Sequence, residues 1–267
     1  MLKAILIIIY RDLLRFWRMK LRSVATMVLP VIWLGLFGPS LAAAFQGARA
    51  FGSLNYLTFL FPGALASNLV FSSIGSATSI VAEREFGFLK EVLVAPVSRL
   101  SIAIGKTVSG AIIATLSTIP MLAAAPLFGV PVTLRTVIVL IPTMFFVAAS
   151  VAGFGVLVGS RLKSVESAQL VFQFLLFPLL FLSGSFAPIT DIPPWLQVLT
   201  ALNPVTYGVD LLRRITFQLL GLSQDTIQSL VVSYHGTALT VHIDIALLSL
   251  FAVCTITAGV FAFAKRE

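Results

Sequence analysis

Charged side chains are scarce in this sequence of 267 residues. Asp, Glu, Lys and Arg together make up 10% of it, and 58% of the residues are hydrophobic, whereas a water-soluble domain carries about 25% charged residues. With a mean hydropathy of +1.04, the chain is too apolar to fold as a soluble domain. We therefore expect a lipid bilayer to be its solvent.

Cysteine and histidine are also rare, with one and two copies. Cys254 has no second cysteine to pair with, so it indicates nothing about the redox compartment. His235 and His242 without a cluster of Cys, Asp or Glu make a weak metal site. An intramembrane serine protease would need a histidine beside Ser183 or Ser185, and both histidines fall in a connection instead. We expect neither a metal site nor a catalytic site.

The net charge of +8 does not indicate a nucleic-acid partner. The basic residues alternate with long apolar stretches rather than gather on one face, which is typical of contact with anionic lipid head groups. Gly105-Lys106-Thr107 is similar to the end of a phosphate-binding loop, but that loop requires a glycine where Leu100 stands and a buried strand before it. We interpret Lys106 as a cytoplasmic anchor at the start of a span.

Six apolar stretches are long enough to cross a bilayer as helices, because a span needs about 20 largely uncharged residues. The predicted spans, all free of Asp, Glu, Lys and Arg, are 23–48, 57–82, 107–130, 136–160, 167–189 and 245–264. Pro62-Gly63 indicates that the residues before the second span lie along the outer rim. The predicted fold is an all-α polytopic membrane protein, with residues 1–267 forming a single transmembrane domain.

The distribution of Lys and Arg predicts the orientation. If the N-terminus is inside, every basic residue lies in a cytoplasmic segment except Arg49, Arg135, Arg213 and Arg214. Because cytoplasmic loops retain positive charge, both termini are predicted to be cytoplasmic.

Residues 1–22 are predicted to form an amphipathic helix in the inner membrane interface. Four arginines share one helical face by their spacing: Arg11, Arg15, Arg18 and Arg22. We expect them to face lipid phosphates, with Trp17 at the depth of the head groups. The alternative is a solvated basic segment.

The cytoplasmic connection 83–97 is predicted to be a short helix that Pro96 ends. Its polar face holds Glu83, Gly87, Lys90 and Glu91, and its apolar face holds Phe86, Leu89 and Leu93. An apolar face outside the bilayer requires a protein partner or the membrane surface to cover it. Periodicity leaves both open.

The longest connection, 191–244, is predicted to be external. Pro193-Pro194-Trp195-Leu196 begins one short helix, and the turn Asn203-Pro204 leads into a second over 205–220, with Asp210 and Arg214 one turn apart. We expect both to sit at the outer leaflet or to dip into it as re-entrant helices. Residues 221–243 indicate only an external location.

The absence of charge inside the spans is informative about mechanism. Proton- or sodium-coupled carriers normally need ionisable groups or broken helices at the midplane, so the energy is expected to enter from outside the membrane. An uncharged path suits a lipid-like or amphipathic cargo. The candidate path residues are Gln169, Gln173, Ser183 and Ser185, with hydrogen bonds between helices as the alternative for the two glutamines. Gly155 and Gly159 predict close helix packing, within the chain or across a dimer.

Three stretches resemble the membrane subunits of type-2 ATP-binding-cassette exporters. They are 56–63 (YLTFLFPG), 83–96 (EREFGFLKEVLVAP) and 182–188 (LSGSFAP), the last continuing to 202–205 (LNPV). The resemblance covers nearly the whole chain. The middle stretch is most similar to the antibiotic- and multidrug-resistance branch of that family.

This resemblance implies that residues 83–93 are a coupling helix docked in a groove of a separate ATPase subunit. The implied coupling residues are Glu83, Arg84, Glu85, Phe86, Gly87, Leu89, Lys90, Glu91 and Leu93. It also implies an N-terminal interface helix, short re-entrant helices before the last span, a homodimer, two ATPase subunits that bind ATP and Mg, and no cofactor on this chain. The implied location is the cytoplasmic membrane of a prokaryote.

The cargo stays open among a hydrophobic drug, a lipid and a lipid-linked glycan. An ion-coupled secondary carrier or channel is the alternative function, and it is disfavoured by the charge-free spans. An integral membrane enzyme is disfavoured by the missing set of acid, base and nucleophile.

Overall fold

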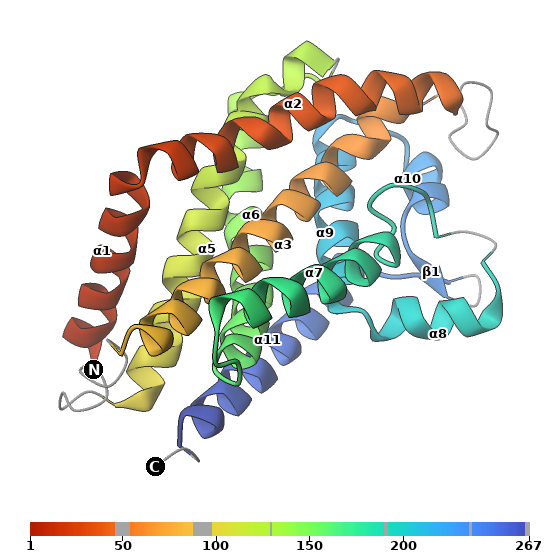
Figure 1. The fold of residues 1–267 in the computed structure, drawn as a ribbon. Coiled ribbons are helices and arrows are strands. Elements are labelled where there is room, and N and C mark those ends of the chain that lie inside the picture. The colour runs from red at the N-terminus through yellow and green to blue at the C-terminus, as the bar shows by residue number, and fades with distance from the viewer. Residues whose placement is uncertain (46–53, 88–97, 129, 190–191, 235–236, 265–267) are drawn as a thin grey trace.

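The computed structural model describes residues 1–45, 54–87, 98–128, 130–189, 192–234 and 237–264. Most of these residues are helical (Figure 1), which confirms the all-α polytopic class. The elements are, in chain order, α1 (Leu2–Arg18), α2 (Lys20–Ala44), α3 (Tyr56–Glu85), α5 (Arg99–Ala124), η2 (Ala125–Phe128), α6 (Leu134–Gly159), α7 (Val165–Phe181), α8 (Pro194–Leu202), α9 (Pro204–Leu219), α10 (Gln224–Leu230), β1 (Ser233–Tyr234), β2 (Thr237–Ala238) and α11 (Val241–Ala264).

Five helical segments of the described chain are long and apolar enough to span a membrane: α2, α3, α5 with η2, α6 and α11. The fifth predicted span, 167–189, corresponds to α7, which has 17 residues and a length of about 26 Å. It is shorter than predicted because the chain turns after Phe181 and Gly184 adopts a φ of +75°, a left-handed conformation that suits glycine. The count of six spans stays a prediction.

Side-chain caps fix where the helices begin. In each of α3, α5, α6, α7 and α9, a side-chain hydroxyl or amide oxygen just before the helix accepts a hydrogen bond from a backbone N–H of the first turn. The capping residues are, in the same order, Asn55, Ser98, Thr133, Ser164 and Asn203. The Ser98 cap starts α5 about two turns before the predicted span start at residue 107. Lys106 is therefore inside a helix rather than at its start.

The helix α3 is the centre of the bundle and is the most buried of the spanning helices. It contacts α2, α5, α6, α7 and α9, and it runs through Pro62 without a break. The small residues of α6 allow it to approach α3 closely. A Cβ added at Gly155 would lie 3.1 Å from Cβ of Ala77, and a Cβ added at Gly159 would lie 3.1 Å from the carbonyl oxygen of Ala77. These glycines thus pack against α3 within the chain.

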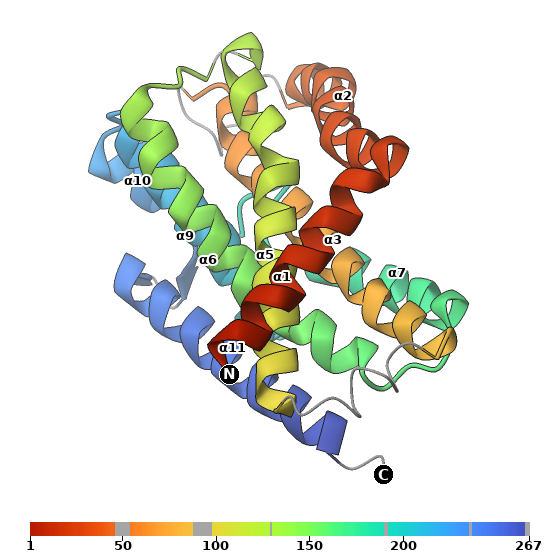
Figure 2. The ribbon, with the colours of Figure 1, turned by 90° about the vertical axis from the view of Figure 1, so that its left-hand side faces the viewer.

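The predicted N-terminal helix 1–22 is divided between two elements. α1 ends at Arg18, Met19 leaves helical geometry, and α2 sets off in a new direction (Figures 1 and 2). α1 packs along α5. One end of the bundle, which we call the inner end, holds the start of α1, the end of α3, the start of α5 and the end of α11 (Figure 1). That this end faces the cytoplasm stays a prediction.

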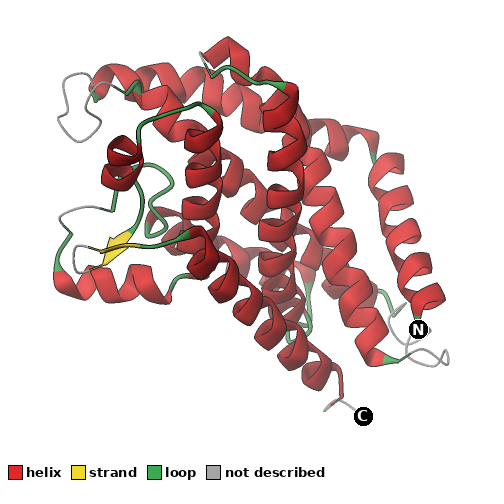
Figure 3. Cartoon of the chain, turned by 180° about the vertical axis from the view of Figure 1, so that it is seen from behind, coloured by secondary structure: helices red, strands yellow, loops and turns green. Residues whose placement is uncertain are grey.

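The connection before α11 contains more structure than its sequence indicated. The helices α8 and α9 lie where two short helices were predicted, but α9 is largely buried in the bundle against α3, α6 and α11. Residues 221–243 include α10 and a two-stranded antiparallel pair, with Ser233 opposite Ala238 (Figure 3). Of the two predicted locations, at the outer leaflet or dipping into it, the packing of α9 inside the bundle agrees with the second.

Candidate functional site

A buried cluster of charges joins the second half of α1 to the last turn of α3 and the first third of α5. We call it the inner junction, and it consists of Arg11, Asp12, Arg15, Glu83 and Lys106. The Lys106 ammonium lies 2.8 Å from Oε1 of Glu83 and 3.1 Å from Oδ2 of Asp12. Arg11 lies 2.7 Å from the same Glu83 oxygen, and Arg15 lies 3.7 Å from it. The cluster thus links three helices through two carboxylates.

The inner junction is electrostatically well satisfied. Asp12, Glu83 and Lys106 are all buried, and Asp12 also accepts a hydrogen bond of 2.9 Å from the Ser109 hydroxyl. Burial alone would lower the pKa of Arg11, but the carboxylates of Glu83 and Asp12 outweigh that effect and raise the pKa above its ordinary value. Arg11 therefore stays protonated and holds α1 against α3.

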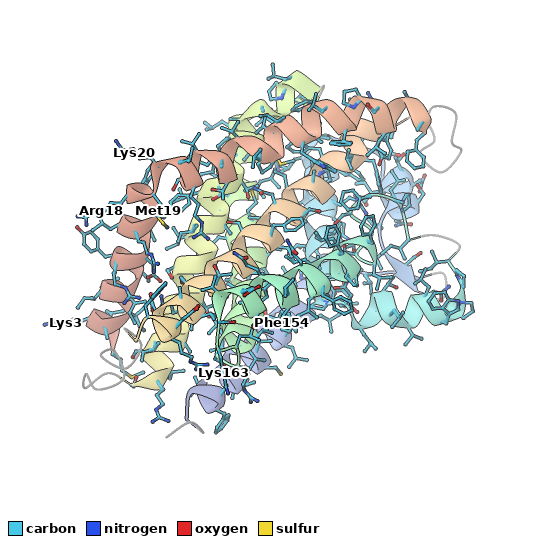
Figure 4. All side chains as sticks on the ribbon, in the orientation of Figure 1. Lys3, Arg18, Met19, Lys20, Phe154 and Lys163 are labelled. Carbon is cyan, nitrogen blue, oxygen red and sulfur yellow. The ribbon has the colours of Figure 1, made fainter. Side chains whose placement is uncertain are left out.

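This arrangement differs from three sequence interpretations. Arg11 and Arg15 were expected to face lipid phosphates, Lys106 was interpreted as a membrane anchor, and Glu83 was implied to contact an ATPase. The structure turns all four toward one another inside the chain. Arg18 keeps the outward direction predicted for the arginine face, and it points away from the bundle together with Lys20 (Figure 4).

The two residues after Glu83 bind a different part of the protein. Arg84 donates a hydrogen bond of 3.0 Å to the carbonyl of Leu162, and the Glu85 carboxylate accepts one of 2.8 Å from the Val165 N–H at the start of α7. The last turn of α3 is thus fastened to α1 and α5 on one side and to the α6–α7 connection on the other.

The predicted helix 83–97 begins differently from expectation. Residues 83–85 are the last turn of α3, Phe86 caps it with 72% of its surface exposed, and Gly87 leaves helical geometry with a φ of +82°. A single helix through Gly87 is therefore wrong. The further candidate coupling residues Leu89, Lys90, Glu91 and Leu93 lie outside the described residues.

A cavity of about 640 Å³ lies next to the inner junction, between α1 and α2 on one side and α3, α5 and α7 on the other. Its inner end is lined by Asp12, Arg15 and Lys106, and Gln169 of α7 also reaches it. Gln173, one turn further along α7, is exposed on the outside of the helix. Of the two glutamines predicted to face a path, one therefore lines the cavity.

A second cavity of about 210 Å³ adjoins the first between α2 and α3. Its walls are mostly apolar and include Trp33, Phe71 and Phe186. Asn68 lines both cavities, and its amide donates a hydrogen bond of 2.8 Å to the Thr118 hydroxyl. The two spaces provide a volume suited to a small ligand inside the bundle.

Ser183 and Ser185 do not line either cavity. Both are fully buried, their hydroxyls lie 2.7 Å apart, and Ser183 also donates to the Leu180 carbonyl. A Cβ added at Gly63 would lie 2.1 Å from the Ser185 carbonyl oxygen. These serines therefore shape a turn that touches the backbone of α3, instead of facing the cavities as predicted.

The turn Asn203-Pro204 connects two elements rather than binding a ligand. The Asn203 side chain accepts a hydrogen bond from the Val205 N–H at 3.0 Å and donates one of 2.7 Å to the Leu179 carbonyl. Pro204 occupies the first turn of α9, where a missing N–H costs nothing. The turn therefore holds α9 against the end of α7.

Two arginines counted as external by sequence are buried. Arg213 donates a hydrogen bond of 2.7 Å to the Gly184 carbonyl, and its guanidinium lies 4.0 Å from the ring centroid of Phe59. Arg214 pairs with Asp210 at 2.6 Å, as its spacing predicted, and lies 3.6 Å from Asp244. These charges stabilise the packing of α9 instead of marking a solvated loop.

Comparison with known proteins gives consistent results. A family model described as ABC-2 type transporter matches residues 3–217. The chain is 29% identical over 218 residues to a putative transport permease, ycf38, of Cyanophora paradoxa, a match that covers 79% of this chain and 73% of that protein. It is 29% identical over 204 residues to the inner membrane transport permease YadH of Escherichia coli K12, covering 74% of this chain and 77% of that protein. A third match, 32% identical over 169 residues, is to the probable multidrug ABC transporter permease YbhR of the same organism and covers 61% of this chain and 45% of that protein.

Proposed function

The chain belongs to the ABC-2 type transporter family, and on this premise we propose that it is the permease subunit of an ATP-driven exporter. It is a multi-pass membrane protein. The observation that carries the proposal is the 640 Å³ cavity inside the bundle, which adjoins the inner junction. A cargo space thereby lies next to the point where energy from an outside partner would enter.

In this proposal a separate ATPase subunit binds ATP and Mg, and residues 86–97 contact that subunit. The high exposure of Phe86 supports this contact, because a large apolar side chain beyond the spans favours a protein partner. Movement of this segment would act on the last turn of α3. Glu83 binds α1 and α5, Arg84 binds the α6–α7 connection, and Glu85 binds the start of α7. The same movement would therefore shift the cavity walls between two arrangements.

We also propose that the permease works as a homodimer joined along α7. The outward face of α7 carries four exposed apolar side chains, namely Leu170, Phe174, Phe177 and Phe181. The polar side chain of Gln173 is exposed on the same helix, and a polar group facing lipid is costly. A second copy of the chain that covers α7 would satisfy Gln173 and would close the cavity beside Gln169.

The proposed cargo is a hydrophobic or amphipathic substrate, such as a drug, a lipid or a lipid-linked glycan. The proposed location is the cytoplasmic membrane of a prokaryote, which the name of the relative YadH, an inner membrane transport permease, supports.

The partner contact is tested by purifying the tagged permease from its native membrane and identifying the proteins that accompany it. We expect a stoichiometric ATPase subunit with the native chain and its loss from the variant Phe86→Ala with Leu89→Ala, while the variant stays inserted. The matched control is Phe261→Ala, which truncates a phenylalanine of similar exposure, 64%, on α11. An ATPase retained by the double variant, together with intact transport, would contradict the coupling role. A permease that is consistently purified without any ATPase would favour an ion-coupled carrier or channel.

A further inference from the structure

The two cavities adjoin each other and together trace a path along α3. They share four lining residues, Leu29, Pro30, Asn68 and Phe71. Their walls follow α3 from Ala64 to Ala82, a separation of 18 residues that corresponds to about 27 Å at the rise of an α-helix. The hydrocarbon core of a bilayer is about 30 Å thick. We call this path the α2–α3 furrow, and it is long enough to follow nearly the whole membrane.

The inner end of the α2–α3 furrow carries excess positive charge. Arg15 and Arg22 both line it, and Arg22 is exposed. The other two charged groups in its wall, Asp12 and Lys106, are paired with each other at 3.1 Å. Counting Arg22 with the inner junction gives four cations against the carboxylates of Asp12 and Glu83. A negatively charged group is therefore favoured there, and a cation is repelled.

Arg15 retains donor capacity for a ligand. Its distance of 3.7 Å to Glu83 is longer than a hydrogen bond, because Arg11 and Lys106 already occupy the same Glu83 oxygen at 2.7 and 2.8 Å. An arginine has five N–H donors in a planar fork that matches the oxygens of a phosphate. Arg15 thus lines the cavity with most of its donors available.

The α2–α3 furrow changes character along its length. Its middle part is lined by hydroxyl and amide groups, including Asn68, Ser72 and Thr78. Its outer part is apolar, and there the rings of Trp33 and Phe186 lie 5.8 Å apart. A ligand that fits the whole furrow needs an anionic end and an apolar end.

We propose that the α2–α3 furrow binds an amphiphile with a negatively charged phosphate head group. The head group lies at Arg15 and Arg22, and the apolar tail extends past Phe71 toward Trp33. This inference rests on the proposed transport function and deepens it by naming the chemical class of the ligand. Such a molecule has two sources: an anionic phospholipid of the surrounding bilayer, and a transported lipid phosphate.

The direct test measures binding to the purified full-length permease in a neutral detergent other than a maltoside. Three probes share one tail and differ in the head group: dodecyl phosphate, dodecyl trimethylammonium and dodecyl maltoside. We expect dodecyl phosphate to bind at least about tenfold more tightly than either of the others, because its head group makes charge-assisted hydrogen bonds to arginine. Inorganic phosphate should bind more weakly than dodecyl phosphate, since it lacks the tail. Equal binding of the phosphate and ammonium probes overturns the proposal.

Matched variants locate the binding site. The variant Arg15→Gln with Arg22→Gln removes the two cations that line the furrow and should weaken dodecyl phosphate binding by about tenfold or more. The control, Arg18→Gln with Lys20→Gln, removes two cations from the same part of the chain that point away from the bundle (Figure 4). It should leave the affinity within about twofold, because exposed charges that point away from the furrow are screened by water and salt. An equal loss of affinity in both double variants overturns the site. Phe71→Ala should weaken dodecyl phosphate but not inorganic phosphate, and the reverse result contradicts the placement of the tail.

The two sources of ligand are separated with the permease–ATPase complex in nanodiscs. If phosphatidylglycerol binds without changing the rate of ATP hydrolysis, it is a resident lipid. If a lipid phosphate raises the rate of ATP hydrolysis and is displaced by dodecyl phosphate, it is a cargo. Either result supports the furrow as a binding site, and neither compound binding overturns it. Because the detergent measurement needs no ATPase, failure of the ligand proposal is distinguishable from failure to recover an ATPase partner.

Discussion

Replacing Lys106 with methionine should destabilise the protein through the inner junction. The Lys106 side chain is 4% exposed, and its ammonium contacts both Glu83 and Asp12. Methionine keeps the length and apolar volume of the stem but removes one of the two cations that the two buried carboxylates share. Removing one partner of a buried ion pair costs about 3–5 kcal/mol.

The lower end of that range is expected at this position. Arg11 remains 2.7 Å from Glu83 and 3.2 Å from Asp12, and Ser109 still donates to Asp12, so neither carboxylate is left without any partner. A loss of about 3 kcal/mol corresponds to a fall of roughly 6–12 °C in the unfolding midpoint. Lys106→Arg keeps the charge and should lose less.

The assay is thermal unfolding of the purified permease in detergent, with Lys20→Met as the control because Lys20 is exposed on the neighbouring part of the chain. That control should stay within about 0.5 kcal/mol of the native protein. If Lys106→Met unfolds at the same temperature as Lys20→Met, the inner junction does not hold α1, α3 and α5 together and the reasoning is refuted.

Three further predictions follow from the packing. Gly63→Ala places a Cβ 2.1 Å from the Ser185 carbonyl oxygen and should cost about 3 kcal/mol or more of unfolding free energy. The control Gly75→Ala, whose added Cβ has nothing within 4 Å, should be neutral or stabilising by about 0.5–1 kcal/mol. Equal midpoints of the two variants in thermal unfolding would contradict the close contact. Arg213→Met removes the hydrogen-bond donor to the Gly184 carbonyl and the cation–π contact with Phe59. The unfolding midpoint should therefore fall by about 2–8 °C, for a loss of about 1–2 kcal/mol of unfolding free energy. An unchanged midpoint would show that this buried charge is dispensable. Glu85→Gln weakens the hydrogen bond that the Glu85 side chain accepts from the Val165 N–H at the start of α7. Amide hydrogen exchange at Val165 should become about threefold to tenfold faster, for a loss of about 1 kcal/mol. Unchanged exchange would rule out this hydrogen bond.

The spanning helices were predictable because their signal is local. A run of about 20 apolar residues identifies a span wherever it packs, and α2, α3, α5, α6 and α11 all contain such a run. The turn before α9 was readable for the same reason, since Asn and Pro mark the start of a helix within two positions.

The inner junction was not predictable because its partners are distant in sequence. Asp12 and Lys106 are 94 positions apart, and Arg11 and Glu83 are 72 apart, so neither helical spacing nor charge counting could pair them. The i, i+4 spacing of Arg11 and Arg15 correctly placed both on one face, but it carried no information on whether that face meets lipid or protein. Only the packing of α1 on α5 decides that.

Two further differences have physical causes of the same kind. Counting basic residues assigned Arg213 and Arg214 to an external loop, because a count by sequence cannot show that α9 folds back into the bundle. Continuous periodicity predicted one helix after residue 83, although Gly87 adopts a left-handed conformation, and a glycine in a periodic pattern is compatible with either outcome.

The most direct test of the account is the movement of a fluorescent amphiphile with a phosphate head group across proteoliposomes that contain the permease and its co-purified ATPase. We predict that movement requires both subunits and hydrolysable ATP, and that it stops when Phe86 and Leu89 are replaced with alanine. Movement that proceeds without ATP, or that an ion gradient drives in the absence of the ATPase, would contradict the assignment of this chain as the permease of an ATP-driven exporter.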